Sequence, residues 1–292
     1  MPTSTPLNQA YRALRRSLAA LALLLPLTAF TPTENIFAPS ADLWDRWQRH
    51  DPQSELSLDF SAWDRLLETY VTRSERGNNL FDYAAVTDAD KAALKGFLAQ
   101  QAAVPISRYA RPQQMAYWIN LYNALTVQVV LDHYPVSTIR DIDISPGFFS
   151  DGPWGKEVIE VEGEALTLND IEHRILRPIW MDPRVHYAVN CASIGCPDLR
   201  VGSYRADQID RQLDEAARRY VNDPRGVSIE GGRVTVSKIY DWFYEDFGRN
   251  PESLLMHLKR YAEPELARRL QEIGEIHDTD YDWDLNAAGS TS

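Results

Sequence analysis

The stretch Met115-Ala-Tyr-Trp-Ile-Asn-Leu-Tyr-Asn-Ala-Leu-Thr-Val-Gln-Val-Val-Leu-Asp-His-Tyr134 decides the fold class, because it predicts a long helix in the middle of the chain. Its apolar residues recur at intervals of three and four positions, which is typical of one face of an α-helix. This apolar set comprises Trp118, Leu121, Tyr122, Leu125 and Val129. Pro135 follows directly and ends the helix, because the residue before a proline is disfavoured in helical geometry.

The same spacing predicts further helices on both sides of this segment. On the N-terminal side, apolar residues have helical spacing at 63–70 and again in Ala92–Leu98. On the C-terminal side, Thr167-Leu-Asn-Asp170 has the signature of a capping box and marks the start of another helix. Four more helices are predicted at Asp207–Asn222, Ile239–Phe247, Pro251–Tyr261 and Pro264–Ile273.

Strands are fewer and shorter than the helices. Lys156–Glu162 and Arg184–Asn190 alternate apolar and polar residues, which is typical of a half-buried strand. Val227–Ile229 and Val234–Val236 flank Gly231-Gly232, a strong signal for a two-residue hairpin turn. The pattern predicts an α+β fold, a mainly helical single domain around a small, mostly antiparallel β-sheet.

The N-terminus has the pattern of a secretory signal peptide. Three arginines, Arg12, Arg15 and Arg16, precede the apolar run Leu18–Phe30. This run of about 13 residues is too short to cross a bilayer, which needs about 20. An uncleaved membrane anchor and a buried core helix are the alternatives. We expect the mature protein to be periplasmic or secreted, with no integral membrane segment after removal of the leader.

The chain is expected to contain one folded domain after this leader. The signal peptide is expected at residues 1–29, and a linker rich in Pro, Ser, Asp and Thr at 30–55, with at most a short helix around Leu43–Trp47. No second linker follows, so residues 56–286 are expected to form a single α+β domain. Residues 287–292 are expected to be a disordered tail.

Composition limits the class of partner. The full chain has a formal net charge of −12, and loss of the leader would make it three units more negative. Such an anionic surface excludes nucleic acid as a partner. The eight Trp and fourteen Tyr fit either an aromatic core or a surface that faces carbohydrate or peptide. The expected partner is a small-molecule or peptide ligand, and no cofactor is expected.

Glu172 lies within the apolar face of the helix that begins near Thr167. Advancing 100° per residue from Leu168 brings Ile171, Ile175 and Leu176 onto the same face as this acid. An ionised carboxylate there is unfavourable unless it is paired. The two interpretations are a buried ion pair that holds the fold and an active-site acid with a perturbed pKa.

Asp246 has the same character in the predicted helix Ile239–Phe247. It projects from a face formed by Ile239, Trp242, Phe243 and Phe247. A salt bridge with Lys238 or Arg177 is the structural interpretation. Two inward-facing acids on two separate helices are harder to dismiss than one, because buried charge seldom lacks a partner or a purpose.

Both cysteines lie in one turn-rich loop that follows the predicted strand Arg184–Asn190. In an exported chain, Cys191 and Cys196 form a disulfide by default. A redox-active pair and a nucleophilic thiolate are the alternatives. Zinc would need His173 or His186 as further ligands, and the spacing matches no standard zinc motif, so no metal site is expected.

Four blocks of the chain, in order, resemble a family known as domain of unknown function 547, which occurs in bacteria and plants. The blocks are Trp118-Ile-Asn-Leu-Tyr-Asn-Ala124, Leu166-Thr-Leu-Asn-Asp-Ile-Glu-His-Arg-Ile-Leu-Arg177, His186-Tyr-Ala-Val-Asn-Cys-Ala-Ser-Ile-Gly-Cys-Pro197 and Ile239-Tyr-Asp-Trp-Phe-Tyr-Glu-Asp-Phe247. They cover about residues 110–250. The closing Tyr281-Asp-Trp-Asp-Leu-Asn286 also resembles the C-terminal end of the family.

The resemblance implies a shared fold but no established reaction. It implies that the chemically suggestive residues belong to the family's recurring motifs: Glu172, His173, His186, Asn190, Cys191, Cys196 and Asp246. Asn120 and Asn123 join this set, one helical turn apart on the long helix. Their structural interpretation is a pair of buried amides that satisfy loop backbone.

Two functions remain open from these residues. The first is a thiol-dependent hydrolase or transferase that acts on a peptide or acyl substrate through Cys191. A histidine would be its base, and Asn120, Asn123 or Asn190 would be oxyanion donors. The second is a non-catalytic periplasmic binding or assembly module with a structural Cys191–Cys196 disulfide. A hydrolase that uses Glu172 and Asp246 is a third possibility, and it depends on their separation.

The choice of histidine follows from the predicted strand. His186 and Cys191 would lie roughly 13–16 Å apart if the strand rises about 3.3 Å per residue. His173 comes from another element and is free to meet the loop. Cys191 is therefore expected to pair with His173 if it pairs with a histidine at all.

Overall fold

Helix α4, Arg111–His133, runs through the middle of the fold. The structure is a computed structural model that describes residues 40–146 and 152–289, all within one compact unit. The predicted periodicity placed one face of this helix in the core. The structure buries every residue from Gln114 to Leu131, so the helix is covered on all sides. Tyr134 adopts an extended conformation before Pro135 and ends the helix where the sequence predicted.

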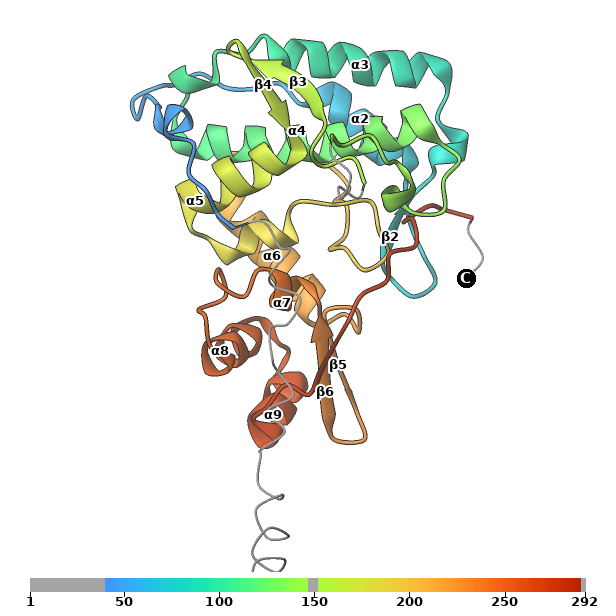
Figure 1. Cartoon of the computed structure of the whole chain (residues 1–292), viewed down its shortest axis with the longest axis vertical. Helices are drawn as coiled ribbons and strands as arrows, with labels where there is room; N and C mark the ends of the chain where they lie inside the picture. The colour runs from blue at the N-terminus through green and yellow to red at the C-terminus, as the bar shows by residue number, and fades with distance from the viewer. Residues whose placement is uncertain (1–39, 147–151, 290–292) are drawn as a thin grey trace, which may run out of the picture. The chain divides into compact units, whose positions relative to one another are not determined.

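The other helices pack around α4 or on the second layer below it (Figure 1). Thr87 directly precedes helix α3, and its hydroxyl accepts a hydrogen bond from the backbone amide of Asp90 and caps the helix. The short 3₁₀ helix η1 lies in the predicted linker and places Trp47 in the core against Trp118, with ring centroids 5.0 Å apart. The α-helices are α2 Ser61–Tyr70, α3 Asp88–Ala102, α4 Arg111–His133, α5 Arg177–Trp180, α6 Ile209–Val221, α7 Ile239–Trp242, α8 Pro251–Tyr261 and α9 Pro264–Ile273. The tighter or wider turns are η1 Asp45–Gln48, η2 Tyr83–Ala85, η3 Ile106–Arg108, η4 Ile139–Asp141, η5 Asp170–Leu176, a π-helix, and η6 Pro183–Tyr187.

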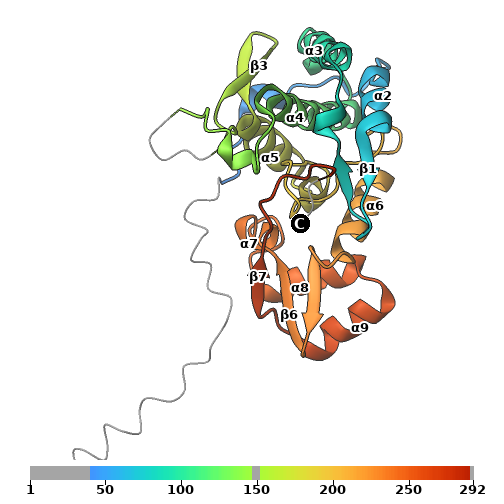
Figure 2. The ribbon, with the colours of Figure 1, turned by 90° about the vertical axis from the view of Figure 1, so that its right-hand side faces the viewer.

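The strands form three small sheets in the described part of the chain. Strands β1, Val71–Arg73, and β2, Asn79–Phe81, pair antiparallel, as do β3, Glu157–Val161, and β4, Glu164–Thr167. The predicted hairpin is present as β5, Val227–Glu230, and β6, Arg233–Ser237, and both glycines of its turn have positive φ. Strand β7, Asp278–Asp280, adds to β6 in parallel, and Figure 2 shows this sheet beside α8 and α9. The prediction of a mainly helical α+β fold is confirmed.

The predicted strand Arg184–Asn190 is wrong. This segment forms the 3₁₀ helix η6 instead, with Pro183 in its first turn and the carboxylate of Asp182 accepting a hydrogen bond from the Arg184 amide. Its side chains do not alternate, because residues 185–190 are all buried. The alternation of apolar and polar residues in this segment therefore does not mark one face of a sheet, because the segment is buried on every side.

Two predicted helices differ in detail from the structure. The capping box at Thr167 is present, since its hydroxyl accepts from the Asp170 amide while the Asp170 carboxylate accepts from the Thr167 amide. The turns that follow are those of the π-helix η5, which continues into α5. The second helix, Ile239–Phe247, ends as α7 at Trp242. Beyond it, the chain forms consecutive turns, with backbone hydrogen bonds between residues three positions apart, as far as Gly248, which has a positive φ.

The C-terminal segment reaches further into the fold than the predicted domain boundary suggests. Ala287 is buried and bridges to Phe81 of β2, so the chain is still packed beyond residue 286. The predicted signal peptide at 1–29 and the end of the tail at 290–292 lie outside the described residues. Within 40–146 and 152–289, no helix is long and apolar enough to cross a membrane.

Replacing Gly226 should destabilise the protein. A Cβ at this position would lie 2.0 Å from the carbonyl oxygen of Tyr220, a backbone atom that cannot move aside cheaply. We expect Gly226→Ala to lower the free energy of unfolding by about 1–3 kcal/mol. Gly96→Ala is the matched control, because nothing lies within 4 Å of its added Cβ inside α3. That change should stabilise the helix by about 0.5–1 kcal/mol. Urea unfolding of both variants checks this, and equal effects would contradict it.

Candidate functional site

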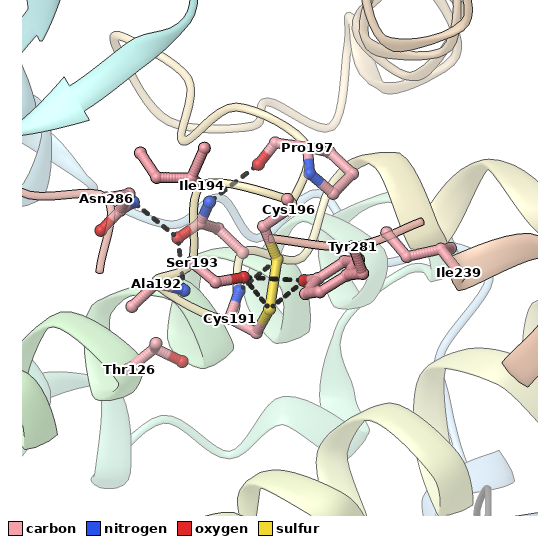
Figure 3. The surroundings of a disulfide bond; sticks show 12 residues. Thr126, Cys191, Ala192, Ser193, Ile194, Cys196, Pro197, Ile239, Tyr281 and Asn286 are labelled. Atoms are coloured by element: carbon pink, nitrogen blue, oxygen red, sulfur yellow. Dashed lines mark hydrogen bonds between the residues drawn. A yellow bond between two sulfur atoms is a disulfide. The ribbon is translucent and has the colours of Figure 1, made fainter. Parts of the chain in front are cut away.

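The two cysteines form a disulfide between Cys191 and Cys196 (Figure 3). Their Cα atoms are 6.2 Å apart, within the range usual for such bonds. The sulfur environments differ, because Cys196 is buried and Cys191 is partly exposed. The backbone amide of Cys191 also donates a hydrogen bond to the Cys196 sulfur.

Two hydroxyl groups lie beside the Cys191 sulfur, and no histidine of the described residues forms a hydrogen bond to it. Its Sγ lies 3.0 Å from the Tyr281 hydroxyl and 3.3 Å from the Ser193 hydroxyl, and these two oxygens are 2.7 Å apart. Figure 3 shows the tyrosine ring pointing at the disulfide from the C-terminal segment. Burial raises the pKa of Tyr281, so its hydroxyl stays protonated and able to donate. Tyr281 was missed as a site residue, although the C-terminal block of the family resemblance contains it.

Asn190 holds the cysteine loop in shape. Its side-chain oxygen accepts from the Ala192 amide at 2.9 Å and from the Asn286 side chain at 3.3 Å. Its side-chain nitrogen donates to the Pro197 carbonyl at 2.7 Å. Ala192 has a left-handed φ of 59°, and the hydrogen bond from its amide helps to maintain this unusual backbone. The Asn190 side chain therefore stabilises the backbone of the cysteine loop.

The two asparagines of α4 do the same for neighbouring loops. Asn123 donates to the Ala188 carbonyl and accepts from the Asn190 amide, at 2.9 and 2.8 Å. Asn120 makes the equivalent pair of bonds to the backbone of Tyr204, both at 2.9 Å. The amide groups of all three asparagines are thus occupied by protein backbone.

The second half of the site is a buried network of charges around His186. Its Nε2 lies 2.7 Å from a carboxylate oxygen of Asp246, and its Nδ1 lies 3.6 Å from a carboxylate oxygen of Glu172. The Nε of Arg177 donates to the same Asp246 oxygen at 2.6 Å. Its terminal nitrogen lies 3.1 Å from Nδ1 of His173, one turn earlier on the same stretch of chain. The network brings together both sequence-predicted acids and both histidines.

Aromatic rings enclose this network. The ring of His186 stacks on Phe243 with centroids 4.1 Å apart and planes at 14°. The guanidinium of Arg177 lies over the same Phe243 ring, 4.7 Å from its centroid. The side chains of Arg177 and His186 are only 2% and 1% exposed, whereas that of Asp246 is 22% exposed. The network therefore meets solvent mainly at Asp246.

The environment shifts the pKa values of both acids in the same direction. Burial alone would raise the pKa of Glu172, but attraction to His173, His186 and Arg177 outweighs it and lowers the pKa to about 2. At Asp246, burial also acts to raise the pKa, but hydrogen bonds from His186 and Arg177 hold it well below its usual range. Both carboxylates are therefore ionised at neutral pH.

His173 is neutral under the same conditions. Burial lowers its pKa to about 4, and the Arg177 cation acts in the same direction against the attraction of Glu172. A neutral imidazole can accept the hydrogen bond from the Arg177 guanidinium, which fixes Nδ1 as the acceptor. His173 hydrogen-bonds to Arg177 in this arrangement and makes no hydrogen bond to either sulfur in the described structure. The conditional pairing of Cys191 with His173 stays a prediction.

The disulfide and the charge network are electrostatically linked. Burial raises the pKa of Tyr122, and the nearby carboxylate of Glu172 raises it further. The same carboxylate adds to the raised pKa of Tyr281 beside the disulfide. The two groups are also connected through the chain, because Phe243, which stacks on His186, directly follows Trp242, whose ring contacts Tyr281. Among the described residues, no group of three or more His, Cys, Asp or Glu is placed to hold a metal ion.

Partly exposed aromatic side chains lie beside the disulfide. Tyr281 contacts Trp242 and Trp283, with centroid distances of 4.8 and 4.7 Å, and Trp283 contacts Trp154 at 6.0 Å. The guanidinium of Arg140 lies over the Trp283 ring, 5.2 Å from its centroid. All four rings are partly exposed, in contrast to the buried tryptophans of the core. The aromatic side chains of the protein therefore form part of the core and also a partly exposed surface next to the disulfide.

Comparison with known families finds a match. The family described as "Protein of unknown function, DUF547" matches residues 106–221, which include Asn120, Asn123 and the cysteine loop. This match confirms the predicted resemblance over three of its four blocks, while the block at 239–247 lies beyond the matched range. No curated protein and no solved structure matches the chain.

Neutralising either buried acid should destabilise the protein strongly. We expect Glu172→Gln and Asp246→Asn each to lower the free energy of unfolding by about 3–5 kcal/mol, because each leaves charged neighbours without a counterion. The controls are Glu215→Gln and Glu245→Gln, whose side chains are 53% and 59% exposed in their ion pairs. These should change stability by about 0–1 kcal/mol. Similar melting temperatures for all four variants would refute the proposed importance of the network.

Neutral, buried His173 should make stability fall in mild acid. Its pKa is about 4 in the folded protein and near 6.5 when unfolded, so the unfolded chain binds an extra proton between these values. Stability is therefore lost as pH falls from about 6.5 to 4. We expect His173→Gln to flatten this dependence by on the order of 2–3 kcal/mol. Exposed His50→Gln is the control, and urea unfolding at several pH values is the measurement. Parallel curves for all three proteins would contradict the prediction.

Proposed function

We propose that this protein is an exported, non-catalytic binding or assembly module with a structural Cys191–Cys196 disulfide, and that its ligand is a small molecule or a peptide. One observation carries the proposal: the groups that a thiol enzyme would use are already engaged with the protein itself. The nucleophile is in a disulfide, and the three candidate oxyanion donors are bonded to loop backbone. An oxyanion hole needs donors that are free to meet the substrate.

The histidines support the same proposal. His173 accepts from Arg177, and His186 lies between the carboxylates of Asp246 and Glu172. A general base must reach the proton that it removes, through a hydrogen bond or one water. Neither imidazole hydrogen-bonds to a sulfur or to Ser193 in the described structure. Their bonds are those of a network that holds η5, η6 and the segment after α7 together.

A hydrolase that uses Glu172 and Asp246 as a pair is less well supported. In such enzymes one carboxyl group keeps a raised pKa and protonates the leaving group. Here the pKa of each carboxyl group is lowered, so neither holds a proton at neutral pH. The imidazole of His186 also stands between the two acids and leaves that position to protein rather than substrate.

The surface beside the disulfide suits a binding role. Trp154, Trp242, Tyr281 and Trp283 are partly exposed and in mutual contact next to the cysteine loop. Aromatic rings supply a large, rigid contact area and lose little side-chain entropy on binding. The buried network would help to hold this surface in place without taking part in chemistry, because Phe243, which stacks on His186, directly follows Trp242 in the chain.

A thiol-dependent hydrolase or transferase is the second candidate, and one contact favours it. If the disulfide were reduced, the protonated Tyr281 hydroxyl, 3.0 Å from Cys191, would donate to a thiolate and stabilise it. In that case the hydroxyl groups of Tyr281 and Ser193 would be the hydrogen-bond donors to the thiolate. This function requires that the mature protein keep Cys191 reduced.

Export is part of the proposal and agrees with the disulfide. Disulfides persist in the periplasm and outside the cell, whereas cytosolic thiols are kept reduced. The basic and apolar leader at 1–29 would deliver the chain to such a compartment. The protein is therefore proposed to act in the periplasm or as a secreted protein.

Intact-mass measurement of protein from the cell envelope tests compartment and redox state together. We expect a chain that lacks about 29 residues and is about 2 Da lighter than its dithiol form. Iodoacetamide should label it only after reduction. The double variant Cys191→Ser/Cys196→Ser should remain folded and lose about 2–3 kcal/mol of stability. A full-length mass would contradict export.

Two results would replace the binding module by the thiol enzyme. The first is labelling of Cys191 in the untreated mature protein. The second is a burst of nitrophenol from p-nitrophenyl acetate with reduced protein that is lost in Cys191→Ser. Tyr281→Phe should then slow alkylation of the reduced protein at neutral pH, because the thiolate would lose its donor.

A further inference from the structure

Strand β5 is an edge of its sheet, because β6 lies between β5 and β7 (Figure 2). A cavity of about 420 Å³ lies beside it, within the range of ligand sites in proteins. Its wall includes all four residues of the strand, Val227–Glu230. Successive side chains of a strand point to opposite faces of the sheet, so a cavity that touches all four residues follows the backbone edge. The rest of the wall comes from α9 and from the segments before β5 and α9, and it comprises Asn222, Pro224, Glu263, Glu265, Leu266 and Arg269.

The register of the hairpin decides which backbone groups of β5 face outward. The Ser237 amide donates to the Gly226 carbonyl, which extends the antiparallel register of β5 and β6 by one pair. Hydrogen-bonded pairs alternate with non-bonded pairs along such a ladder. Every second residue from Gly226 therefore faces β6, and the backbone groups of Val227 and Ile229 face outward.

Each of these two residues has one outward group in use and one free. The Val227 amide donates to the Asp223 carbonyl at 3.0 Å, and the Ile229 carbonyl accepts from the Arg269 side chain at 3.3 Å. In the part of the chain that the structure describes, the Val227 carbonyl and the Ile229 amide make no hydrogen bond. A strand edge with an unpaired acceptor and an unpaired donor is a template for a further strand.

These two free groups fit a neighbour that runs parallel to β5. In a parallel ladder, a single residue opposite Ser228 donates its amide to the Val227 carbonyl and accepts from the Ile229 amide. An antiparallel neighbour would divide the two bonds between two residues, and the remaining group of each would face the Val227 amide or the Ile229 carbonyl. Asp223 and Arg269 already occupy those two groups. The edge therefore favours a parallel segment in which one residue is fully paired.

The wall of the cavity carries a net negative charge, since it contains three glutamates and one arginine. Glu230 and Glu263 form no ion pair with any described residue, whereas Glu265 pairs with Arg268 at 2.6 Å. The wall's arginine, Arg269, is held at the strand edge. A cationic occupant is therefore favoured. A second copy of this edge would bring the same carboxylates together, and opposed like charges are unfavourable.

We propose that the outer edge of β5 binds an extended, basic segment of another protein as an added parallel strand. One residue of that segment pairs with the Val227 carbonyl and the Ile229 amide, and these main-chain bonds supply affinity. Its basic side chains are attracted to Glu230 and Glu263, and its apolar side chains contact Leu266. The residues of this edge are not those of the aromatic surface beside the disulfide, so the inference holds whatever that surface binds.

The test uses the fluorescein-labelled peptide Lys-Val-Lys-Val-Lys and measures its dissociation constant by anisotropy at low ionic strength. The native protein should bind this peptide and should not bind Glu-Val-Glu-Val-Glu. The double variant Glu230→Gln/Glu263→Gln should raise the dissociation constant about tenfold, because the carboxylates that attract the lysines are lost. Glu75→Gln, at an exposed position between β1 and β2, is the control and should leave it unchanged. No binding of the basic peptide, or equal effects of the two changes, would overturn the proposal.

Two further changes test the main-chain pairing. Ile229→Pro removes the outward amide and no bond to β6, so it should keep the hairpin and raise the dissociation constant about tenfold. On the native protein, an N-methyl group on the central lysine of the peptide should have the same effect, because it removes the donor to the Val227 carbonyl. This second measurement needs no variant and decides the question if Ile229→Pro does not fold. Equal affinity for the plain and the N-methylated peptide would indicate a site for small cations, and a native dimer that Ile229→Pro abolishes would assign the edge to a second copy; either would overturn the proposal.

Discussion

The burial of α4 on all sides is the constraint on which the rest of the structure depends. A helix with no solvent face buries the polar side chains that it carries, and a buried polar group is unfavourable unless it finds a partner inside the protein. Asn120 and Asn123 meet this requirement by bonding to the backbone near Tyr204 and Ala188. These bonds fix two loops that have no regular secondary structure of their own. The cysteine loop is one of them, so its shape follows from the position of the central helix.

A second layer of polar contacts holds the charged half of the site. Arg177 connects Asp246, which lies beyond α7, to His173 in the π-helix. The extra residue per turn of a π-helix changes which side chains share a face, and such turns are frequent at functional sites. In this chain the π-helix carries Glu172 and His173 inward together. The network thereby joins segments that are about 60–70 residues apart in sequence.

The disulfide lies among polar groups that are bonded to the protein itself. Asn190 bonds to the backbone of Ala192 and Pro197, and the hydroxyl groups of Tyr281 and Ser193 lie 2.7 Å apart. Such a connected set of hydrogen bonds favours a rigid surface around the cysteine loop.

The sequence by itself left the partner of Asp246 open between Lys238 and Arg177, but it determined the helical body, the hairpin at Gly231-Gly232 and the burial of Glu172. These features depend on local periodicity, turn chemistry and the cost of burying charge, all of which act over a few residues. It did not determine the 3₁₀ turn at Pro183–Tyr187, the π-helix, or the neighbours of Cys191. Those depend on segments that are distant in the chain, such as Tyr281 and Asn286. Only tertiary packing decides which distant groups meet. In a segment that is buried on every side, the alternation of apolar and polar residues also no longer indicates which face is buried, so the pattern cannot predict its structure.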